Sequence, residues 1–301
     1  MTRHLLDVTD LSPDELRHVL ELAGRPPAEL GRPLDGQGAA LIFEKPSLRT
    51  RQSMEMAVVQ LGGHPIYTRG EEIGIDVREP LEDATRILQG YHALLAARVF
   101  SHDVLERMVA VAEVPVVNML SEHSHPLQAL ADALTMEQVV GSLAGRTVAW
   151  VGDYNNVARS LAEVCLLLGA RVRLACPFGY DPDEAELERL ALLGGGGVTV
   201  TDRPSEAVAG ADAVHSDTWV SMGQEADKTA RKQAFEGFTV DAELMGLAGP
   251  EAVFMHCLPA YRGLEVTTDV IDGPRSVVIQ QGHNRLHAAR GALAFLLGEH
   301  G

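Results

Sequence analysis

The stretch "GAALIFEKPSLRTR", residues 38–51, changes from apolar to strongly cationic within a few positions. Its first part is an apolar run with the length and composition of a buried strand. Pro46 and Ser47 then form a turn, and Arg49 and Arg51 open a helical pattern. A strand followed by a turn and a helix is the repeating unit of α/β folds with parallel sheets. The stretch therefore predicts an α/β fold, with arginines and hydroxyls placed where a strand ends.

The same alternation of strand-like and helical runs continues along the chain. In the first half, strand-like runs near 38–43, 64–68, 97–100 and 115–118 alternate with helical patterns at 49–62, 80–95, 102–112 and 125–140. In the second half, strands are predicted in "RTVAWVGD", "RVRLACP", "GVTVTD", "DAVHSD" and "EAVFMHC", and helices at 156–168 and 284–297. Near the N-terminus, "LSPDEL" has the serine, proline and glutamate of a capped helix start.

The glycine-rich segment "GSLAG", residues 141–145, divides this alternation into two sets of comparable size. We therefore expect an α/β fold of two doubly wound parallel-sheet domains joined by interdomain helices. The first domain is expected at residues 1–140 and the second at 141–283. The C-terminal helix, about 284–301, is expected to pack back on the first domain.

Composition and charge exclude several classes of protein. The 301 residues carry a formal net charge of −17, so neither nucleic acid nor an anionic membrane surface is an expected partner. No apolar run approaches the roughly 20 residues that span a bilayer, and the N-terminus has no signal-peptide pattern. Three scattered cysteines without a CxxC pair argue against a disulfide framework and a zinc site, and they predict a cytoplasmic protein.

Several motifs that follow predicted strands are suited to ligands, because α/β sheets bind ligands at the carboxyl ends of strands. The cationic turn has helix-start N–H groups and arginine forks suited to phosphate, although a capped helix with solvated arginines has the same pattern. It is not a P-loop, since GxxxxGK[ST] is absent. His125 and Gln128 in "HPLQALAD" could bind a planar ligand or cap a helix. Cys257 in "HCLP" could equally be a buried inert thiol.

Taken together, "FEKPSLRTR", "HPLQALAD", "DTWVSMGQE", "HCLPAYRG" and "NRLH" resemble the aspartate/ornithine carbamoyltransferase family, in the same order and over nearly the whole chain. The SMG and HCLP elements are similar to its ornithine branch. The resemblance implies transfer of the carbamoyl group of carbamoyl phosphate to the δ-amine of L-ornithine, giving L-citrulline and phosphate in arginine metabolism. It also implies a homotrimer or a multiple of trimers, with sites at subunit interfaces, and no metal or organic cofactor.

The resemblance also implies the site residues, position by position. The carbamoyl-phosphate site would comprise Ser47, the Leu48 backbone, Arg49, Thr50, Arg98, His125, Gln128, Cys257, Leu258 and Arg285. The ornithine site would comprise Asn156, Asp217, Ser221 and Met222. The catalytic set would be Arg98, His125, Asp217 and Cys257, the first two at the carbamoyl oxygen and the last two beside the attacking nitrogen. Gln128, the Leu258 carbonyl and Arg285 would hold the carbamoyl amine.

The chain departs from the family's pattern at four places. Leu48 replaces a threonine, but its backbone is the part that the site uses. In the loop after the second predicted strand, Gly74 stands where relatives offer a neighbouring subunit a glutamine, histidine or lysine side chain, and Arg78 is the candidate replacement. His283 replaces a glutamate and Tyr261 a histidine, and both are expected to lie behind the residues that touch substrate.

Other functions remain open on the sequence. A carbamoyltransferase for an acylated ornithine or another amine is the nearest alternative, although Asp217 suits the cationic α-amino group that acylation would neutralise. An aspartate acceptor is disfavoured because the loop lacks its lysine. A nicotinamide-dependent dehydrogenase fits the alternation, but only Gly152 of a dinucleotide fingerprint is in place. A non-catalytic homologue should have lost Arg49, His125 or Cys257, and none is lost.

Overall fold

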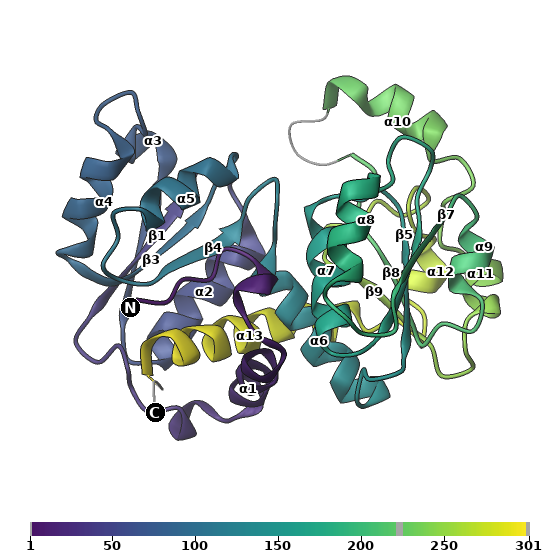
Figure 1. The fold of residues 1–301 in the computed structure, drawn as a ribbon, viewed down its shortest axis with the longest axis horizontal. Helices are drawn as coiled ribbons and strands as arrows, with labels where there is room; N and C mark the ends of the chain where they lie inside the picture. Colours follow the sequence, from purple (N-terminus) through teal and green to yellow (C-terminus); the bar gives the residue numbers. More distant parts are fainter. Residues whose placement is uncertain (1, 221–224, 299–301) are drawn as a thin grey trace. The chain divides into compact units, whose positions relative to one another are not determined.

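The computed structural model describes residues 2–220 and 225–298, which form two compact units (Figure 1). Unit 1 contains the described residues up to Leu134 and from His283 onward, and unit 2 contains those from Thr135 to Gly282. Each unit is built on a parallel sheet, which confirms the predicted α/β fold with two doubly wound sheets. The division falls inside two helices, α6 (Pro126–Val140) and α13 (Val278–Gly298), so both have residues in each unit.

Unit 1 has its described strands in the order β2-β1-β3-β4. The strands are β1 (Gly38–Phe43), β2 (His64–Arg69), β3 (His92–Arg98) and β4 (Val116–Leu120). Its other helices are η1 (Val8–Asp10), α1 (Pro13–Gly24), η2 (Pro27–Glu29), α2 (Leu48–Gln60), α3 (Gly70–Ile73), α4 (Leu81–Gln89) and α5 (His102–Val109). The chain moves in opposite directions from β1 to β2 and from β3 to β4. Right-handed crossovers therefore place α2 and α5 on opposite faces of the sheet.

Unit 2 has its described strands in the order β7-β6-β5-β8-β9. The strands are β5 (Thr147–Val151), β6 (Arg171–Ala175), β7 (Val198–Thr201), β8 (Ala213–Ser216) and β9 (Val253–His256). Its helices are α7 (Asn156–Leu167), α8 (Glu184–Ala191), α9 (Pro204–Val208), η3 (Glu225–Asp227), α10 (Lys228–Ala234), α11 (Ala242–Leu247) and α12 (Thr268–Ile271). Figure 1 shows α7 and α8 on one face of this sheet, and α9, α11 and α12 on the other.

One predicted helix was too long. The sequence predicted a helix at 80–95 and a strand at 97–100, but α4 ends at Gln89 and β3 already begins at His92. The segment "HALLAAR" consists mainly of alanine and leucine, which favour helix, and it lacks β-branched residues. It forms a strand because it pairs with β1 on one side and β4 on the other, inside the core of unit 1. Tertiary pairing thus overrides local propensity.

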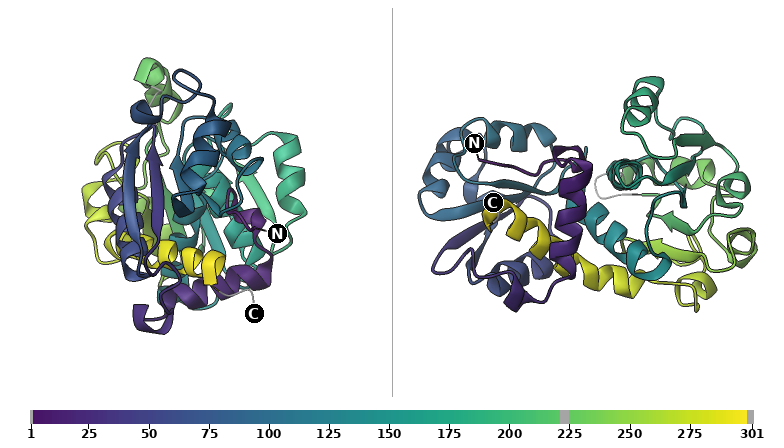
Figure 2. Two further views of the ribbon diagram at one scale, coloured as in Figure 1. Left: turned by 90° about the vertical axis from the view of Figure 1, so that its left-hand side faces the viewer. Right: turned by 60° about the horizontal axis from the view of Figure 1, so that its bottom comes forward.

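The predicted start of α1 is confirmed. Ser12 Oγ accepts the Glu15 backbone N–H at 3.3 Å, and the Glu15 carboxylate accepts the Ser12 N–H at 2.9 Å, which is a capping box. Figure 2 shows α1 beside the long C-terminal helix α13, within unit 1. None of the helices in the described ranges combines the length and apolar character that crossing a membrane would require.

Candidate active site

Several of the predicted site residues follow the central strands of the two sheets. In unit 1 the chain reverses its direction across the sheet between β1 and β3, and the Ser47 turn follows β1 while Arg98 ends β3. In unit 2 the reversal lies between β5 and β8, which Asn156 and Asp217 follow. Ligands of open α/β sheets bind at such reversals, outside the carboxyl ends of the strands. The topology therefore gives each unit its own candidate ligand-binding region.

The start of α2 provides the helix N-terminus that the sequence predicted. Ser47 is the N-cap, and its hydroxyl accepts the backbone N–H of Thr50 at 3.3 Å. Leu48 is 74% exposed, so its side chain is not needed for packing, and its predicted role uses only the backbone. Arg49 is half-buried in the first helical turn. This turn combines backbone N–H groups, a favourable helix dipole and a cation, which together suit an anion.

Two buried arginines converge on the hydroxyl of Thr50. Arg285 Nη2 lies 2.8 Å from Thr50 Oγ1, and Arg98 Nη1 lies 3.3 Å from the same oxygen. All three side chains are more than nine-tenths buried. A guanidinium can only donate, so the hydroxyl oxygen accepts from both. Two buried positive charges beside a helix start strongly favour a phosphate over a neutral ligand.

His125 and Gln128 lie at the start of α6, next to Arg285. The Arg285 guanidinium donates to Gln128 Oε1 and lies 3.4 Å from His125 Nε2. Gln128 Nε2 donates in turn to Asp132 Oδ1 at 2.7 Å. Burial, followed by the positive charges of Arg285 and Arg98, holds the pKa of His125 well below its ordinary value. The imidazole is therefore neutral at neutral pH and can donate from only one ring nitrogen.

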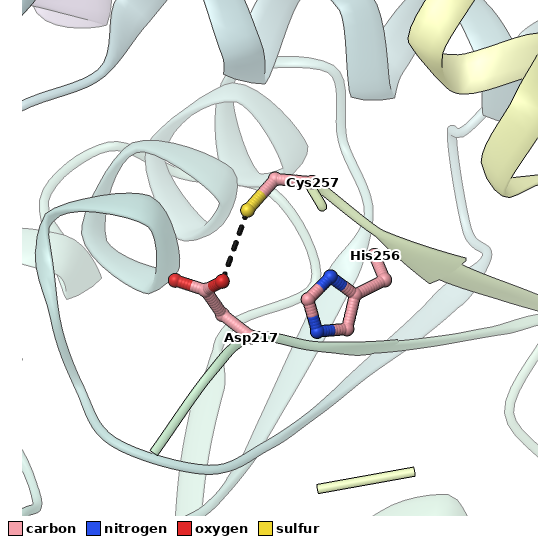
Figure 3. Close-up of side chains that lie close together, drawn as sticks. All are labelled: Asp217, His256 and Cys257. Atoms are coloured by element: carbon pink, nitrogen blue, oxygen red, sulfur yellow. Dashed lines mark hydrogen bonds between the residues drawn. The ribbon is translucent and has the colours of Figure 1, made fainter. Parts of the chain in front are cut away.

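In unit 2, Asp217 and Cys257 form a hydrogen-bonded pair (Figure 3). Cys257 Sγ donates to Asp217 Oδ1 at 3.0 Å. Asn155 Nδ2 donates to the other carboxylate oxygen, Asp217 Oδ2, at 2.9 Å. Asp217 is buried and the thiol is half-buried. The arrangement unites an anion that can attract an ammonium group with a weakly acidic thiol, which is a suitable pair for handling a proton.

His256 supports the turn that carries Cys257. His256 Nδ1 accepts the Leu258 backbone N–H at 2.9 Å, so the proton of the neutral ring is on Nε2. That nitrogen lies 3.4 Å from Glu265 Oε1, and both side chains are fully buried. Polar atoms of Asp217, His256 and Cys257 lie within 4.8 Å of one another. Because both imidazole nitrogens already face protein groups, we assign no metal ligands here, and the absence of a metal requirement stays a prediction.

The predicted ornithine residues are only partly described. Asn156 is the first residue of α7, directly after its N-cap Asn155. Ser221 and Met222 lie outside the described residues. The carbonyl of Leu258 was predicted to bind substrate. Leu258 has a φ of 57°, a left-handed backbone conformation that residues other than glycine rarely adopt. Because this conformation costs free energy in a residue with a side chain, we infer that the geometry of the turn at Leu258 is important.

The groups that hold Asp217 and the turn of Cys257 were not predicted from the sequence. Asn155 had a recognisable signal, since an asparagine before an apolar helix is a common N-cap, but its bond to Asp217 had none. Glu265 and Gln281 had no signal, because their partners are far away in the sequence. Gln281 Oε1 accepts the His256 backbone N–H at 2.9 Å, and its amide nitrogen lies 3.1 Å from His215 Nε2.

The loop after β2 is ordered within unit 1. Gly74 has a φ of 59°, a backbone conformation that favours glycine. Arg107, on α5, donates to both carboxylate oxygens of Asp76 at 2.6 and 2.9 Å. Arg78, the candidate replacement donor, donates to the Glu72 carbonyl at 3.0 Å and so serves its own loop.

The other two departures from the family's pattern are exposed side chains. His283 lies on α13, and Tyr261 is 54% exposed in the turn that follows β9. The backbone N–H of Tyr261 donates to the buried Glu265 carboxylate, at 2.5 Å. Tyr261 therefore contributes to the turn through its backbone N–H, which a histidine at this position would also supply.

The fold and the two clusters define a class of protein: a two-unit α/β protein with a buried cationic cluster in one unit and a carboxylate–thiol pair in the other. Comparison with known proteins identifies the family. The aspartate/ornithine carbamoyltransferase model for the carbamoyl-P binding domain matches residues 3–138, and the model for the Asp/Orn binding domain matches residues 144–296. The chain belongs to the aspartate/ornithine carbamoyltransferase family.

Individual relatives are similar over almost the whole chain. An ornithine carbamoyltransferase of Thermus thermophilus is 48% identical over 299 residues, which cover 99% of this chain and 97% of the relative. The solved ornithine carbamoyltransferase of Pyrococcus furiosus has a TM-score of 0.92 and 42% identity, covering 99% of this chain and 97% of that one. A solved N-acetyl-L-ornithine transcarbamylase mutant has a TM-score of 0.87 and 31% identity, covering 97% and 99%. None of these findings supports the dehydrogenase that the sequence left open.

Proposed function

We propose that the chain transfers the carbamoyl group of carbamoyl phosphate to the δ-amine of L-ornithine, giving L-citrulline and phosphate. The observation that carries the proposal is the convergence of Arg98 and Arg285 on Thr50 at the start of α2. That cluster is a ready site for the phosphate of carbamoyl phosphate. The proposal is supported by family membership and by relatives that are named ornithine carbamoyltransferases.

In this proposal the residues of the α2 turn bind the phosphate. Ser47, the Leu48 N–H, Arg49 and Thr50 supply donors, and arginine neutralises the charge that grows on the leaving phosphate. Arg98 reaches from β3 toward both the phosphate and the carbamoyl oxygen. The segment 1–140 then serves as the carbamoyl-phosphate domain, and the segment 141–283 as the ornithine domain.

The carbamoyl carbon becomes tetrahedral when the amine attacks it, and its oxygen gains negative charge. Fixed donors aimed at that oxygen usually give the largest single catalytic effect. Arg98, Thr50 and the neutral imidazole of His125 are the proposed donors. Gln128 Oε1 and the Leu258 carbonyl can accept from the carbamoyl amine. Since a guanidinium only donates, Arg285 acts on that amine indirectly, by orienting Gln128.

The acceptor must lose a proton before it can attack. An alkyl amine has a pKa of about 10.4, so only a small fraction is nucleophilic at neutral pH. The neutral δ-nitrogen bonds to the carbamoyl carbon, the carbon–oxygen bond to phosphate breaks, and phosphate leaves with the electron pair. The nitrogen then gives up one further proton. The Asp217 and Cys257 pair is the proposed site through which these protons pass.

Ornithine is favoured over its acylated form as the acceptor. Free ornithine has an α-ammonium group, and Asp217 is a buried anion that can bind it, whereas N-acetylornithine lacks that charge. Asn156 and the Met222 N–H are the proposed donors to the carboxylate. The similarity to a solved N-acetyl-L-ornithine transcarbamylase keeps the acylated acceptor as the alternative to be tested.

A homotrimer, or a multiple of trimers, is part of the proposal. In unit 1, β2 is an edge strand, and apolar side chains near it are exposed: Met56 and Val59 on α2, Ile66 on β2 and Tyr91 before β3. An apolar sheet edge of this kind is suited to contact with another copy. A cytoplasmic location fits three cysteines without a disulfide, and arginine metabolism follows from the substrates.

The test is citrulline formation from carbamoyl phosphate and four acceptors. We expect ornithine to give the highest kcat/KM and lysine to be lower by about 10- to 200-fold, because one extra methylene misplaces the amine. Putrescine and N-acetylornithine each lack one charged group and should be near background. N-acetylornithine equal to ornithine would overturn the choice of acceptor, and no product with any amine would overturn the proposed function.

A further inference from the structure

Asn155 joins the start of a helix to a carboxylate of the site through one planar carboxamide. As the N-cap of α7, its Oδ1 accepts the backbone N–H groups of Val157 at 2.9 Å and Ala158 at 3.0 Å. Its Nδ2 donates to Asp217 Oδ2 at 2.9 Å. Two accepted bonds fix the plane of the amide, and this aims the remaining donor at the carboxylate. The orientation of Asp217 is therefore tied to the first turn of α7.

Both oxygens of Asp217 are held. Oδ2 faces Asn155 and Oδ1 faces the Cys257 thiol, while the carboxylate is buried from solvent. The other charged groups nearby already have partners. Asp153 pairs with Arg231 Nη1 at 2.7 Å, and the imidazole of His256 is engaged by Leu258 N–H and Glu265. Among the described residues Asn155 is the neighbour that donates to Oδ2, so the loss of its donor would let the carboxylate turn away from the thiol.

We propose that Asn155 is a positioning residue for the acceptor. It holds Asp217 so that one carboxylate oxygen stays on Cys257 and the carboxylate presents a fixed face to the α-ammonium group of the acceptor. The proposal rests on ornithine being the acceptor. Asn155 acts through Asp217 and does not itself need to touch substrate. Its effect should therefore fall on the acceptor and leave the binding of carbamoyl phosphate, whose proposed phosphate-binding residues lie in unit 1, unchanged.

Two substitutions separate the donor from the cap. Asn155→Asp and Asn155→Ser each keep an oxygen that can cap α7, because aspartate and serine are as good at the N-cap as asparagine. Both remove the amide donor, and only the first adds a group that titrates. The matched control is Asp241→Ser, which changes the N-cap of α11 in the same unit, where the side chain accepts the Leu244 N–H at 2.8 Å.

We expect both Asn155 variants to lower kcat/KM for ornithine at pH 8 by about 10- to 100-fold, with KM for carbamoyl phosphate within twofold of wild type. The pH dependence should distinguish them. As the pH falls from 9 to 6, the introduced carboxyl of Asn155→Asp gains a proton and with it a donor, since two adjacent carboxylates cannot both stay ionised. Its activity relative to wild type should therefore rise, while that of Asn155→Ser stays flat. Asp241→Ser should match wild type throughout.

A measurement on the thiol tests the same link without turnover. Cys165 and Cys176 are buried, so iodoacetamide reports mainly on the half-buried Cys257. A carboxylate that has turned away no longer accepts the thiol proton, so the thiol ionises more readily, and alkylation at fixed pH should be at least threefold faster in Asn155→Ser and unchanged in Asp241→Ser. Unchanged alkylation, or a loss of ornithine activity with the same pH dependence in both variants, would overturn the role of Asn155. A wild-type enzyme that makes no citrulline would overturn the proposed function alone, because the alkylation rates still decide the link.

Discussion

Thr50 illustrates how one hydroxyl can organise a charged site. Its side chain is 1% exposed, and its oxygen accepts from the guanidinium groups of both Arg98 and Arg285. The Ser47 hydroxyl is 3.1 Å away, so the same oxygen is connected to the helix cap. Removing that acceptor would leave two buried cations with one fewer partner, in a place where solvent cannot substitute.

We predict that Thr50→Val reduces kcat/KM for carbamoyl phosphate by about 10²- to 10³-fold, the usual cost of removing one preorganised polar group of an active site. Valine keeps the volume and branching of threonine, so packing should be preserved. Unfolding free energy should fall by about 1–3 kcal/mol, because the guanidinium groups lose an acceptor. Thr50→Ser keeps the hydroxyl and is the control. Steady-state kinetics and urea unfolding check both effects, and a Val variant as active as the Ser variant would contradict the role given to this oxygen.

At the residue scale, the sequence was sufficient to choose the chemical groups but not their partners. The resemblance assigned Thr50, Arg98 and Arg285 to one site, and the structure places these three side chains together, while their role in ligand binding stays a prediction. The link from Asn155 to Asp217 spans 62 positions, and no local pattern encodes it. A side chain that positions another one meets its partner only in the tertiary fold, so a local sequence pattern does not reveal it.

Among the elements, the crossing of α1 and α13 is unusually close. A Cβ added to Gly291 would lie 2.6 Å from the Ala23 nitrogen and 2.7 Å from the Val19 carbonyl oxygen. Both of these are backbone atoms of α1, which cannot move aside as the end of a flexible side chain can. The helices approach this closely only because residue 291 has no side chain.

We predict that Gly291→Ala destabilises the protein by about 1–3 kcal/mol, the cost of overpacking a tight contact. Helix propensity alone would predict the opposite, a gain of about 1 kcal/mol. Gly282→Ala is the matched control on the same helix, since an added Cβ there meets nothing within 4 Å. It should stabilise by up to about 1 kcal/mol. Chemical unfolding of the two variants decides the matter, and equal shifts in both would mean that the crossing is looser than described.

The predictions of helices and strands were correct where a local sequence pattern determines the element, and wrong where pairing between strands determines it. The start of α1 was predictable because its cap residues, Ser12 and Glu15, are neighbours. The segment "HALLAAR" was misread because its composition favours helix, and only its position between β1 and β4 makes it a strand. The start of α13 at Val278 lies six residues before the predicted one, because Val278, Ile279 and Gly282 have low helix propensity.

At the scale of the whole molecule, buried and half-buried histidines make the stability sensitive to acid. Burial is the largest cause that lowers the pKa of each of four histidines: His4, His92, His125 and His287. A lowered pKa in the folded state means that the unfolded chain binds more protons below about pH 6.5. Stability should therefore fall as the pH drops from 7 toward 5.

We predict a lower urea midpoint at pH 5.5 than at pH 7.5, with at most about 1.4 kcal/mol lost per pH unit for each such histidine. His92→Gln should reduce this difference, because glutamine does not titrate. His64→Gln, which changes an exposed histidine at the start of β2, is the control and should leave it unchanged. Midpoints that do not depend on pH between 7.5 and 5.5 would contradict the assignment of neutral, buried imidazoles.

The loop after β2 bears on the assembly. Arg107 pairs with Asp76 and with Glu82, whose carboxylate lies 2.8 Å from the Arg107 Nε, and holds the loop in one conformation. Val77, at its tip, is 88% exposed. An ordered loop with an exposed apolar tip is suited to contact another surface, and in the proposed trimer that surface would be the site of a neighbouring copy.

Mixing two inactive variants tests whether this loop acts on a neighbouring copy. One variant carries Arg49→Ala, which removes a proposed phosphate donor, and the other lacks residues 71–78. If a site combines the Ser47–Thr50 turn of one copy with the loop of the next, a 1:1 mixture reassembled at random should have about a quarter of all its sites with both parts intact, by closed assembly. Activity should then return to about that fraction, whereas each unmixed variant stays inactive. If the loop serves its own copy, every site lacks one part, and mixed trimers verified by mass will show no recovery whatever their composition.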